Sequence, residues 1–162
     1  MIVVSDTSPL NYLILINLVD VLAKLFQEVY IPPSVVVELT DPDAPEVVRA
    51  WIQSPPSWLK IKAPSARLAS TFVLDSGEAD ALSLAKELHI TDILIDEWHG
   101  RNVAQQEGFT LIPTLAVLER AAIQNLLDLR IAIARLQQTN IRITPDQIQA
   151  ALNRDYARRH RN

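Results

Sequence analysis

Four acidic residues occupy positions where a solvated carboxylate is not expected. Asp6 and Asp96 end the apolar runs IVVS and ILI, and Glu38 and Glu78 lie among the apolar residues of expected helices. Carboxylates that converge in one cleft raise one another's pKa unless a cation lies among them. Oxygen ligands of this kind suit Mg²⁺ or Mn²⁺. The residue types therefore predict an acidic site for one of these ions.

The segment 73–101 holds two of these acids and the elements that position them. At helical spacing Glu78 lies on the same face as Leu82 and Ala85. Asp96 ends the next expected strand, at the strand edge where open α/β sheets bind ligands. We therefore expect all four carboxylates to line one cleft at this edge, close enough to share ions. Three other acids should point elsewhere: Asp80, Glu87 and Glu97.

Strands and helices alternate along the chain, which predicts an α/β sandwich around a mostly parallel sheet. Strands are expected at 2–5, 29–31, 58–62, 93–95 and 111–112, with a long apolar helix at 9–26. Ser8, directly before Pro9, is the expected N-cap of that helix. Thr144, Pro145 and Gln147 have the spacing of a capping box at the start of the last helix.

Three of the four acids also have a structural interpretation that the sequence leaves open. Asp6 could close the strand–helix corner as an Asx-turn. Glu38 could be an exposed side chain on a short helix. Glu78 follows Asp75 by three residues, which is close to a capping box, although that role is compatible with a site role.

Composition restricts the class of protein. Hydrophobic residues make up 49% of the 162-residue chain and charged residues 21%, as in a folded domain. The absence of cysteine excludes disulfides, thiolate catalysis and cysteine-ligated zinc. The net charge of −4 argues against a non-specific nucleic-acid binder. No apolar run reaches the length of a membrane span and the start has no basic signal region, so we expect a cytoplasmic protein without a membrane partner.

Two segments have residues that could contact nucleic acid. The proline-rich segment 41–66 carries Trp51 and Trp58 near lysines, which could stack on bases, but packed tryptophans and solvated lysines are the favoured interpretation. The last helix ends in the basic sequence RDYARRHR, and a solvated, fraying terminus is favoured there over an RNA-binding arm. Arg101 could contact phosphate, but a surface arginine is the simpler interpretation.

Three motifs follow one another in a specific order: VSDTSPL at 4–10, LDSGEADALSLA at 74–85 and LIDE at 94–97. In these the chain resembles the PIN-domain family of nucleases, which includes the VapC-type toxins, and it is most similar to a small PIN-like branch with VSDTSPL and GEAxAxxLA motifs. The resemblance spans roughly residues 2–127. It implies a three-layer α/β/α sandwich, and a single PIN-like domain at 1–162 with a C-terminal helical extension at about 128–162.

The resemblance also assigns roles to the acids. The family's acid after the first strand corresponds to Asp6, its helix acid to Glu38 in IPPSVVVEL, its helix-start acid to Glu78, and its last strand-end acid to Asp96. It implies that all four are catalytic residues and metal ligands of an endoribonuclease that uses Mg²⁺ or Mn²⁺. Glu78 stands where many PIN domains have Asp, and the segments at 113–118 and 121–127 depart from the branch's pattern. The second departure concerns packing and partner contacts, not the acids.

The sequence also leads to expectations about the protein's partners and its alternative functions. The resemblance implies an RNA substrate and an antitoxin protein, and together with the apolar helices at 9–26 and 113–136 it predicts a homodimer. An aspartyl phosphatase would need a second Asp two residues after Asp6, where this chain has Ser8. A PIN-like module that acts through protein or RNA binding, without catalysis, stays open as an alternative.

Overall fold

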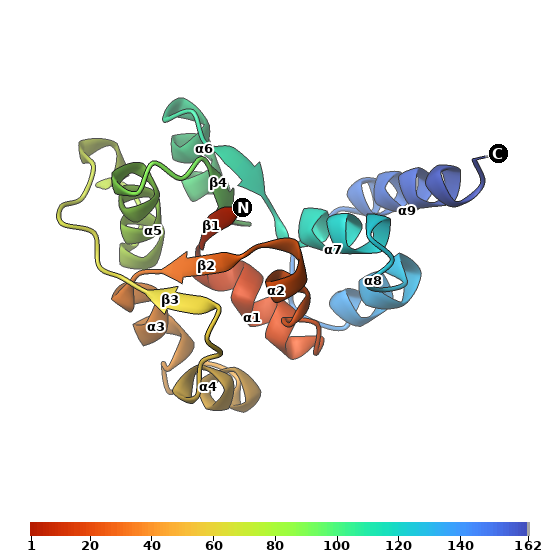
Figure 1. Cartoon of the computed structure of the whole chain (residues 1–162), viewed down its shortest axis with the longest axis horizontal. Helices are drawn as coiled ribbons and strands as arrows, with labels where there is room; N and C mark the ends of the chain where they lie inside the picture. Colours follow the sequence, from red (N-terminus) through yellow and green to blue (C-terminus); the bar gives the residue numbers. More distant parts are fainter. Residues whose placement is uncertain (162) are drawn as a thin grey trace. The chain divides into compact units, whose positions relative to one another are not determined.

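Residues 1–114 form a compact unit that is built on a parallel sheet (Figure 1). The computed structural model describes residues 1–161, and of Trp98 the backbone alone. Within these residues the sheet has five strands in the order β3-β2-β1-β4-β5, all paired in parallel. The strands are β1 Ile2–Ser5, β2 Glu28–Ile31, β3 Leu59–Ile61, β4 Asp92–Leu94 and β5 Thr110–Ile112. The expected parallel sheet is confirmed.

Both faces of the sheet are covered, because both faces of its central strand are buried. Val3 and Val4 on β1 are each 0% exposed, and adjacent strand residues point to opposite faces. On one face Val4 packs in a cluster with Ile93, Leu82 and Val103. Val3, which points to the other face, is equally buried. The architecture is the expected three-layer α/β/α sandwich.

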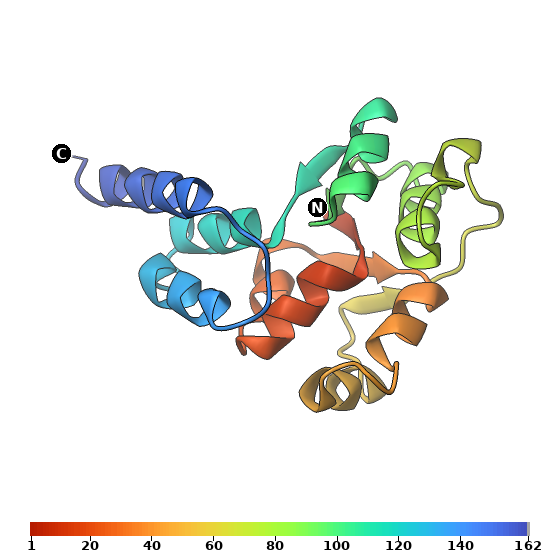
Figure 2. The same cartoon turned by 180° about the vertical axis from the view of Figure 1, so that it is seen from behind.

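Helices connect the strands of this sandwich. They are α1 Thr7–Leu15, α2 Val21–Leu25, α3 Pro33–Leu39, α4 Glu46–Gln53, the 3₁₀ helix η1 Ala69–Thr71, α5 Ser76–Glu87 and α6 Trp98–Gln106. Helix α5 packs against β1 and β4, and α6 packs against β5 (Figures 1 and 2). On α4, Trp51 lies with its ring centroid 6.0 Å from that of Trp58, so the interpretation as packed tryptophans is confirmed.

Two local predictions near the first helix are wrong. The apolar segment at 9–26 is interrupted between α1 and α2, where Asn17 adopts a left-handed backbone with φ 59°. Asparagine tolerates this conformation better than most residues, so it ends a helix that hydrophobicity alone would continue. The N-cap position of α1 is occupied by Asp6 and not by Ser8, and Asp6 makes no capping hydrogen bond through its side chain.

Residues 115–162 form a second compact unit, separate from the unit at 1–114. The last helices of the chain are α7 Thr114–Ile123, α8 Leu129–Gln137 and α9 Pro145–Arg159, and α8 packs against α9. The predicted capping box at Thr144 and Gln147 is present. The division at 114 comes earlier than the expected boundary near 127. The assignment of one domain to the whole chain stays a prediction. Asn162, the last residue of the expected extension, lies outside the described residues. No helix among the described residues is long and apolar enough to span a membrane.

Candidate active site

Two of the four acids leave neighbouring strands at the same edge of the sheet. Ser5 of β1 is in register with Leu94 of β4, and the backbone N–H of Asp6 donates to the Leu94 carbonyl at 2.9 Å. Asp6 and Asp96 therefore follow adjacent strands at their carboxyl ends. Strand β1 lies between β2, which follows it in the chain, and β4. The strand order therefore reverses between β1 and β4, at the edge where Asp6 and Asp96 lie. Such a point is the usual ligand site of a parallel sheet.

Asp6 is the most deeply buried acid of the site. Its side chain is 2% exposed, and its Oδ1 atom has no hydrogen-bond partner among the described residues. Burial raises the pKa of Asp6 well above its usual range. A hydrogen bond from the Thr7 backbone lowers this pKa, whereas the charges of Glu78, Asp75 and Glu38 raise it further. The Asx-turn interpretation has no capping hydrogen bond in its support. Asp6 is therefore a buried acid whose Oδ1 atom has no donor among the described residues.

Glu38 extends from α3 toward the start of α5. The hydroxyl of Thr7 donates to Glu38 Oε2, and the backbone of Gly77 also hydrogen-bonds to the carboxylate. Burial raises the pKa of Glu38, and repulsion from Asp75 and Glu97 adds to this against the two hydrogen bonds. The side chain is half-buried and hydrogen-bonded, so the interpretation as an exposed helix glutamate is wrong.

Glu78 lies in the first turn of α5 and is 6% exposed. A Cβ added at Gly100 would lie 3.4 Å from Glu78 Oε2, so the carboxylate faces the start of α6. Burial raises the pKa of Glu78 to about 7, helped by repulsion from Asp75, Glu97 and Glu38. The capping role belongs to Asp75, whose Oδ1 accepts a hydrogen bond of 2.8 Å from the Glu78 backbone N–H. Glu78 is thus left with a carboxylate that can exchange a proton near neutral pH.

Asp96 is held by Thr114. Its Oδ1 accepts from the Thr114 backbone N–H at 2.8 Å, and its Oδ2 accepts from the Thr114 hydroxyl at 2.6 Å. Burial raises the pKa of Asp96, although these two hydrogen bonds and the charge of Arg101 act in the opposite direction. The carboxylate is therefore fixed in one orientation at the end of β4, and Arg101 lies near enough to act on its charge.

The structure brings Asp6, Glu38 and Glu78 within electrostatic range of one another, since both glutamates raise the pKa of Asp6. Asp75 belongs to the same group, because its charge raises the pKa of all three. The sequence indicates Asp75 only as a helix cap. Its second role depends on the approach of α3 and α5, which no local pattern reveals.

The prediction that three other acids point elsewhere is confirmed for two and wrong for one. Asp80 pairs with Arg67 at 2.7 Å, and Glu87 accepts hydrogen bonds from Ser65. Glu97 instead faces the site: its Oε1 accepts from Ser8 Oγ at 3.1 Å, and its charge raises the pKa of Glu38, Glu78 and Asp96. Its position immediately after Asp96 at the start of α6 is the reason.

No group of three or more acidic or histidine side chains is arranged to hold a metal ion within the described part of the chain. The expectation that the four carboxylates lie close enough to share ions is therefore not met by these side-chain positions. The donor set nevertheless fits a hard cation. Its ligating atoms are all oxygen, its charges repel one another, and Asp6 Oδ1 is buried without a donor among the described residues.

Comparison with known proteins identifies the family. A family model described as a PIN domain matches residues 2–155, which is most of the chain. No curated protein and no solved structure matches the chain. PIN domains are generally nucleases, and the parallel sheet with acids at its carboxyl edge agrees with such a fold. From its sequence and its fold, this chain belongs to the PIN-domain family.

Proposed function

We propose that this protein is a metal-dependent endoribonuclease whose site is the acidic edge of β1 and β4. The observation that carries the proposal is Asp6 Oδ1, which is buried without a hydrogen-bond partner among the described residues and lies within electrostatic range of three further acids, Glu78, Asp75 and Glu38. Leaving a buried carboxylate oxygen without a partner is costly. A bound Mg²⁺ or Mn²⁺ ion would satisfy this atom and remove the repulsion around it.

Asp6 and Asp96 would hold the ion directly, and Glu38 and Glu78 would complete its ligand set. When bound, the ion supplies a hydroxide nucleophile and neutralises charge on the scissile phosphate. The chain itself orients two of the ligands, because Thr7 fixes Glu38 and Thr114 fixes Asp96. The raised pKa of Glu78, about 7 without metal, comes from the burial and the repulsion that a bound cation would relieve. Burial of Asp6 keeps bulk water from its side chain.

The test is cleavage of a 5′-labelled single-stranded RNA in Mg²⁺, in Mn²⁺ and in chelator, with analysis of the product ends. Wild type should release 5′-phosphate ends only with metal. Asp6→Asn and Glu78→Gln should lower the rate about 100-fold or more. Asp80→Asn is the matched control, since Asp80 shares α5 with Glu78 but pairs with Arg67. An intact RNA in every metal would instead favour a non-catalytic PIN-like module.

The proposal extends to partners. We expect an antitoxin protein, encoded by a small upstream reading frame with a DNA-binding motif, whose product inhibits cleavage. We also expect a homodimer, on the basis of the apolar segments at 9–26 and 113–136. Light scattering over a wide concentration range tests the dimer, and a constant monomer mass would rule it out. The cytoplasmic location stays a prediction.

A further inference from the structure

The first turn of α5 brings together acids from two parts of the chain. The backbone N–H groups in the first turn of a helix have no partner within the helix itself. In α5 the N–H of Glu78 donates to Asp75 Oδ1 at 2.8 Å. The backbone of Gly77 hydrogen-bonds to the carboxylate of Glu38, which belongs to α3. Carboxylates are therefore bound at two adjacent positions of this turn.

Asp75 is the N-cap of α5, and this role does not require its charge. Asparagine and serine cap helices about as well as aspartate does. A negative charge is favourable at the start of a helix, but Glu38 and Glu78 already supply one there. A hydrogen bond also joins the side chains of Asp75 and Glu78. Because a carboxylate has no donor of its own, this contact needs a proton or a cation between the two groups.

The charge of Asp75 reaches three acids of the candidate active site. It raises the pKa of Asp6, Glu38 and Glu78, and among the charges that act on the two glutamates it has the largest effect. Asp6 is 2% exposed, and its Oδ1 atom has no hydrogen-bond partner among the described residues, whereas Asp75 is exposed to solvent. The group of acids therefore extends from a buried carboxylate to one that an ion in solvent can reach.

We propose that Asp75 is a fifth acid of the cation site, where its carboxylate binds the Mg²⁺ or Mn²⁺ ion together with the four acids already assigned to it. The inference rests on the proposed function, because that function supplies the ion. A cation at this place relieves the repulsion between Asp75 and Glu78 and satisfies Asp6 Oδ1. A role as helix cap alone explains the hydrogen bond from the Glu78 N–H, but it does not explain the contact between the two carboxyl groups.

The test separates the cap from the charge by three substitutions at one position. Asp75→Asn and Asp75→Ser keep a capping side chain and remove the carboxylate, whereas Asp75→Ala removes both. Isothermal titration measures the binding of Mn²⁺ to the full chain without RNA. Asp75→Asn and Asp75→Ser should bind Mn²⁺ about 10- to 100-fold more weakly than wild type. Asp75→Ala should bind at least as weakly, and in chelator it should melt about 2–4 °C lower because it has lost the cap.

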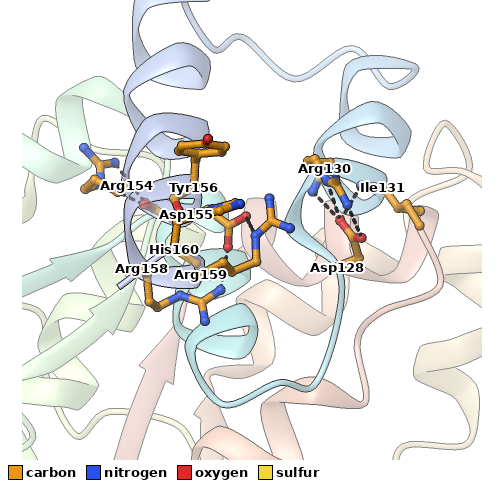
Figure 3. A network of polar contacts seen from close by, with 10 residues as sticks. Asp128, Arg130, Ile131, Arg154, Asp155, Tyr156, Arg158, Arg159 and His160 are labelled. Atoms are coloured by element: carbon orange, nitrogen blue, oxygen red, sulfur yellow. Dashed lines mark hydrogen bonds and ion pairs between the residues drawn. The ribbon is translucent and has the colours of Figure 1, made fainter. Parts of the chain in front are cut away.

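Two matched controls come from the same chain. Asp128 caps α8 in the unit at 115–162, where its Oδ1 atom accepts from the backbone N–H groups of Arg130 at 2.9 Å and Ile131 at 3.4 Å (Figure 3). Asp128→Asn therefore makes the same change at a cap that has no acidic site beside it. Asp80→Asn removes a charge from α5 itself, where Asp80 pairs with Arg67. Both controls should bind Mn²⁺ as wild type does.

Two results would overturn the assignment of Asp75. If Asp75→Asn and Asp75→Ser bind Mn²⁺ like wild type and Asp75→Ala alone binds it weakly, Asp75 acts only as a cap that positions Glu78. If Asp80→Asn weakens binding as much as Asp75→Asn does, the effect is that of distant charge and not of a ligand. Thermal melts in chelator confirm that each variant is folded before it is titrated.

RNA cleavage at increasing Mn²⁺ concentrations separates this inference from the nuclease proposal. The Mn²⁺ concentration that gives half the maximal rate should rise in Asp75→Asn by the same factor as its dissociation constant. Weaker Mn²⁺ binding by Asp75→Asn and Asp75→Ser, without cleavage by wild type, would overturn the nuclease and support Asp75 as a ligand. Cleavage by wild type, with normal Mn²⁺ binding by both variants, would overturn the role of Asp75 and leave the nuclease intact. Wild type that binds no Mn²⁺ would overturn both.

Discussion

Gly77 lies directly against the carboxylate of Glu38. A Cβ at position 77 would come 2.5 Å from Glu38 Oε1 and 2.8 Å from Oε2, closer than real atoms approach. The first turn of α5 thus leaves space for an acid that arrives from α3. Glycine at this position is required by a neighbouring side chain, not by backbone conformation, because Gly77 has no positive φ.

Gly77→Ala should therefore displace Glu38 and lower the cleavage rate about 10- to 100-fold, since moving a catalytic group from its productive position slows the reaction. The clashing atoms end a flexible side chain, so the free energy of unfolding should change by less than about 1 kcal/mol. Kinetics and urea unfolding measure the two effects. Ser76→Ala, at the preceding position of α5, is the control. An active Gly77→Ala would show that Glu38 has no catalytic role.

Asp6→Asn should separate the metal site from a structural Asx-turn. In chelator the variant should be more stable than wild type by about 1–2 kcal/mol, because it removes a buried charge near Glu78, Asp75 and Glu38. With Mg²⁺ or Mn²⁺ at about ten times its Kd, wild type should gain about 1.4 kcal/mol, and the variant much less. Thermal melts with and without metal decide this, with the exposed Asp20→Asn as control. Identical melts for all proteins would contradict the metal site.

The stability of the metal-free protein should fall as pH rises from 4.5 to about 7. The pKa of Glu78 is raised by burial from its ordinary 4.5 to about 7, so over this interval the folded protein keeps a proton that the unfolded chain has released. The free energy of unfolding then decreases with pH and levels off above about pH 7, a loss on the order of 1–2 kcal/mol after solvent screening.

Urea unfolding in chelator across this pH range measures the effect. Glu78→Gln should reduce the slope, because glutamine does not titrate, and the raised pKa values of Asp6, Glu38 and Asp96 should leave the remainder. Glu46→Gln removes an exposed carboxylate from α4 and should leave the slope as in wild type. A wild-type curve that rises with pH over the interval would show that the environment of Glu78 favours its charged form.

Thr114→Val should leave Asp96 in the chain but hold its carboxylate less firmly. The variant loses the hydroxyl donor to Asp96 Oδ2 and keeps the backbone donor to Oδ1. We expect the free energy of unfolding to fall by about 1–2 kcal/mol and cleavage to fall about tenfold. Thr114→Ser should restore both, and Thr110→Val, at an exposed position on β5, should change neither. Unchanged kinetics in Thr114→Val would remove Asp96 from the catalytic set.

Several parts of the site can be predicted from the sequence because they depend on local pattern. The β-branched run before Asp6 and the apolar run before Asp96 predict two buried strands, and parallel strands end at one edge. The pattern also identifies Glu38 and Glu78 as candidate site residues, because each interrupts the apolar stripe of a helix. The helical spacing also excludes Asp80 correctly, since a polar face leads away from the sheet.

The remaining parts depend on contacts between distant segments. Thr114 lies eighteen residues from Asp96, and Thr7 lies thirty-one residues from Glu38. Nothing in either threonine's neighbourhood indicates its partner. The break at Asn17 is hidden by an apolar pattern that continues through it, because hydrophobicity reports burial and not backbone conformation. The orientation of Glu97 escapes prediction because a helix start can turn its first side chain in either direction.

The sheet order has a consequence for how the chain is made. β1 leaves the ribosome well before β4, yet it lies at the centre of the sheet, where Val4 pairs with Ile93. Until β4 has been synthesised, one edge of β1 has no partner, and the acid at 96 does not yet exist. Pairing across such a sequence separation is slow because the loop must close first. Under the proposed function, a nascent chain that lacks β4 therefore cannot cut the message from which it is being translated.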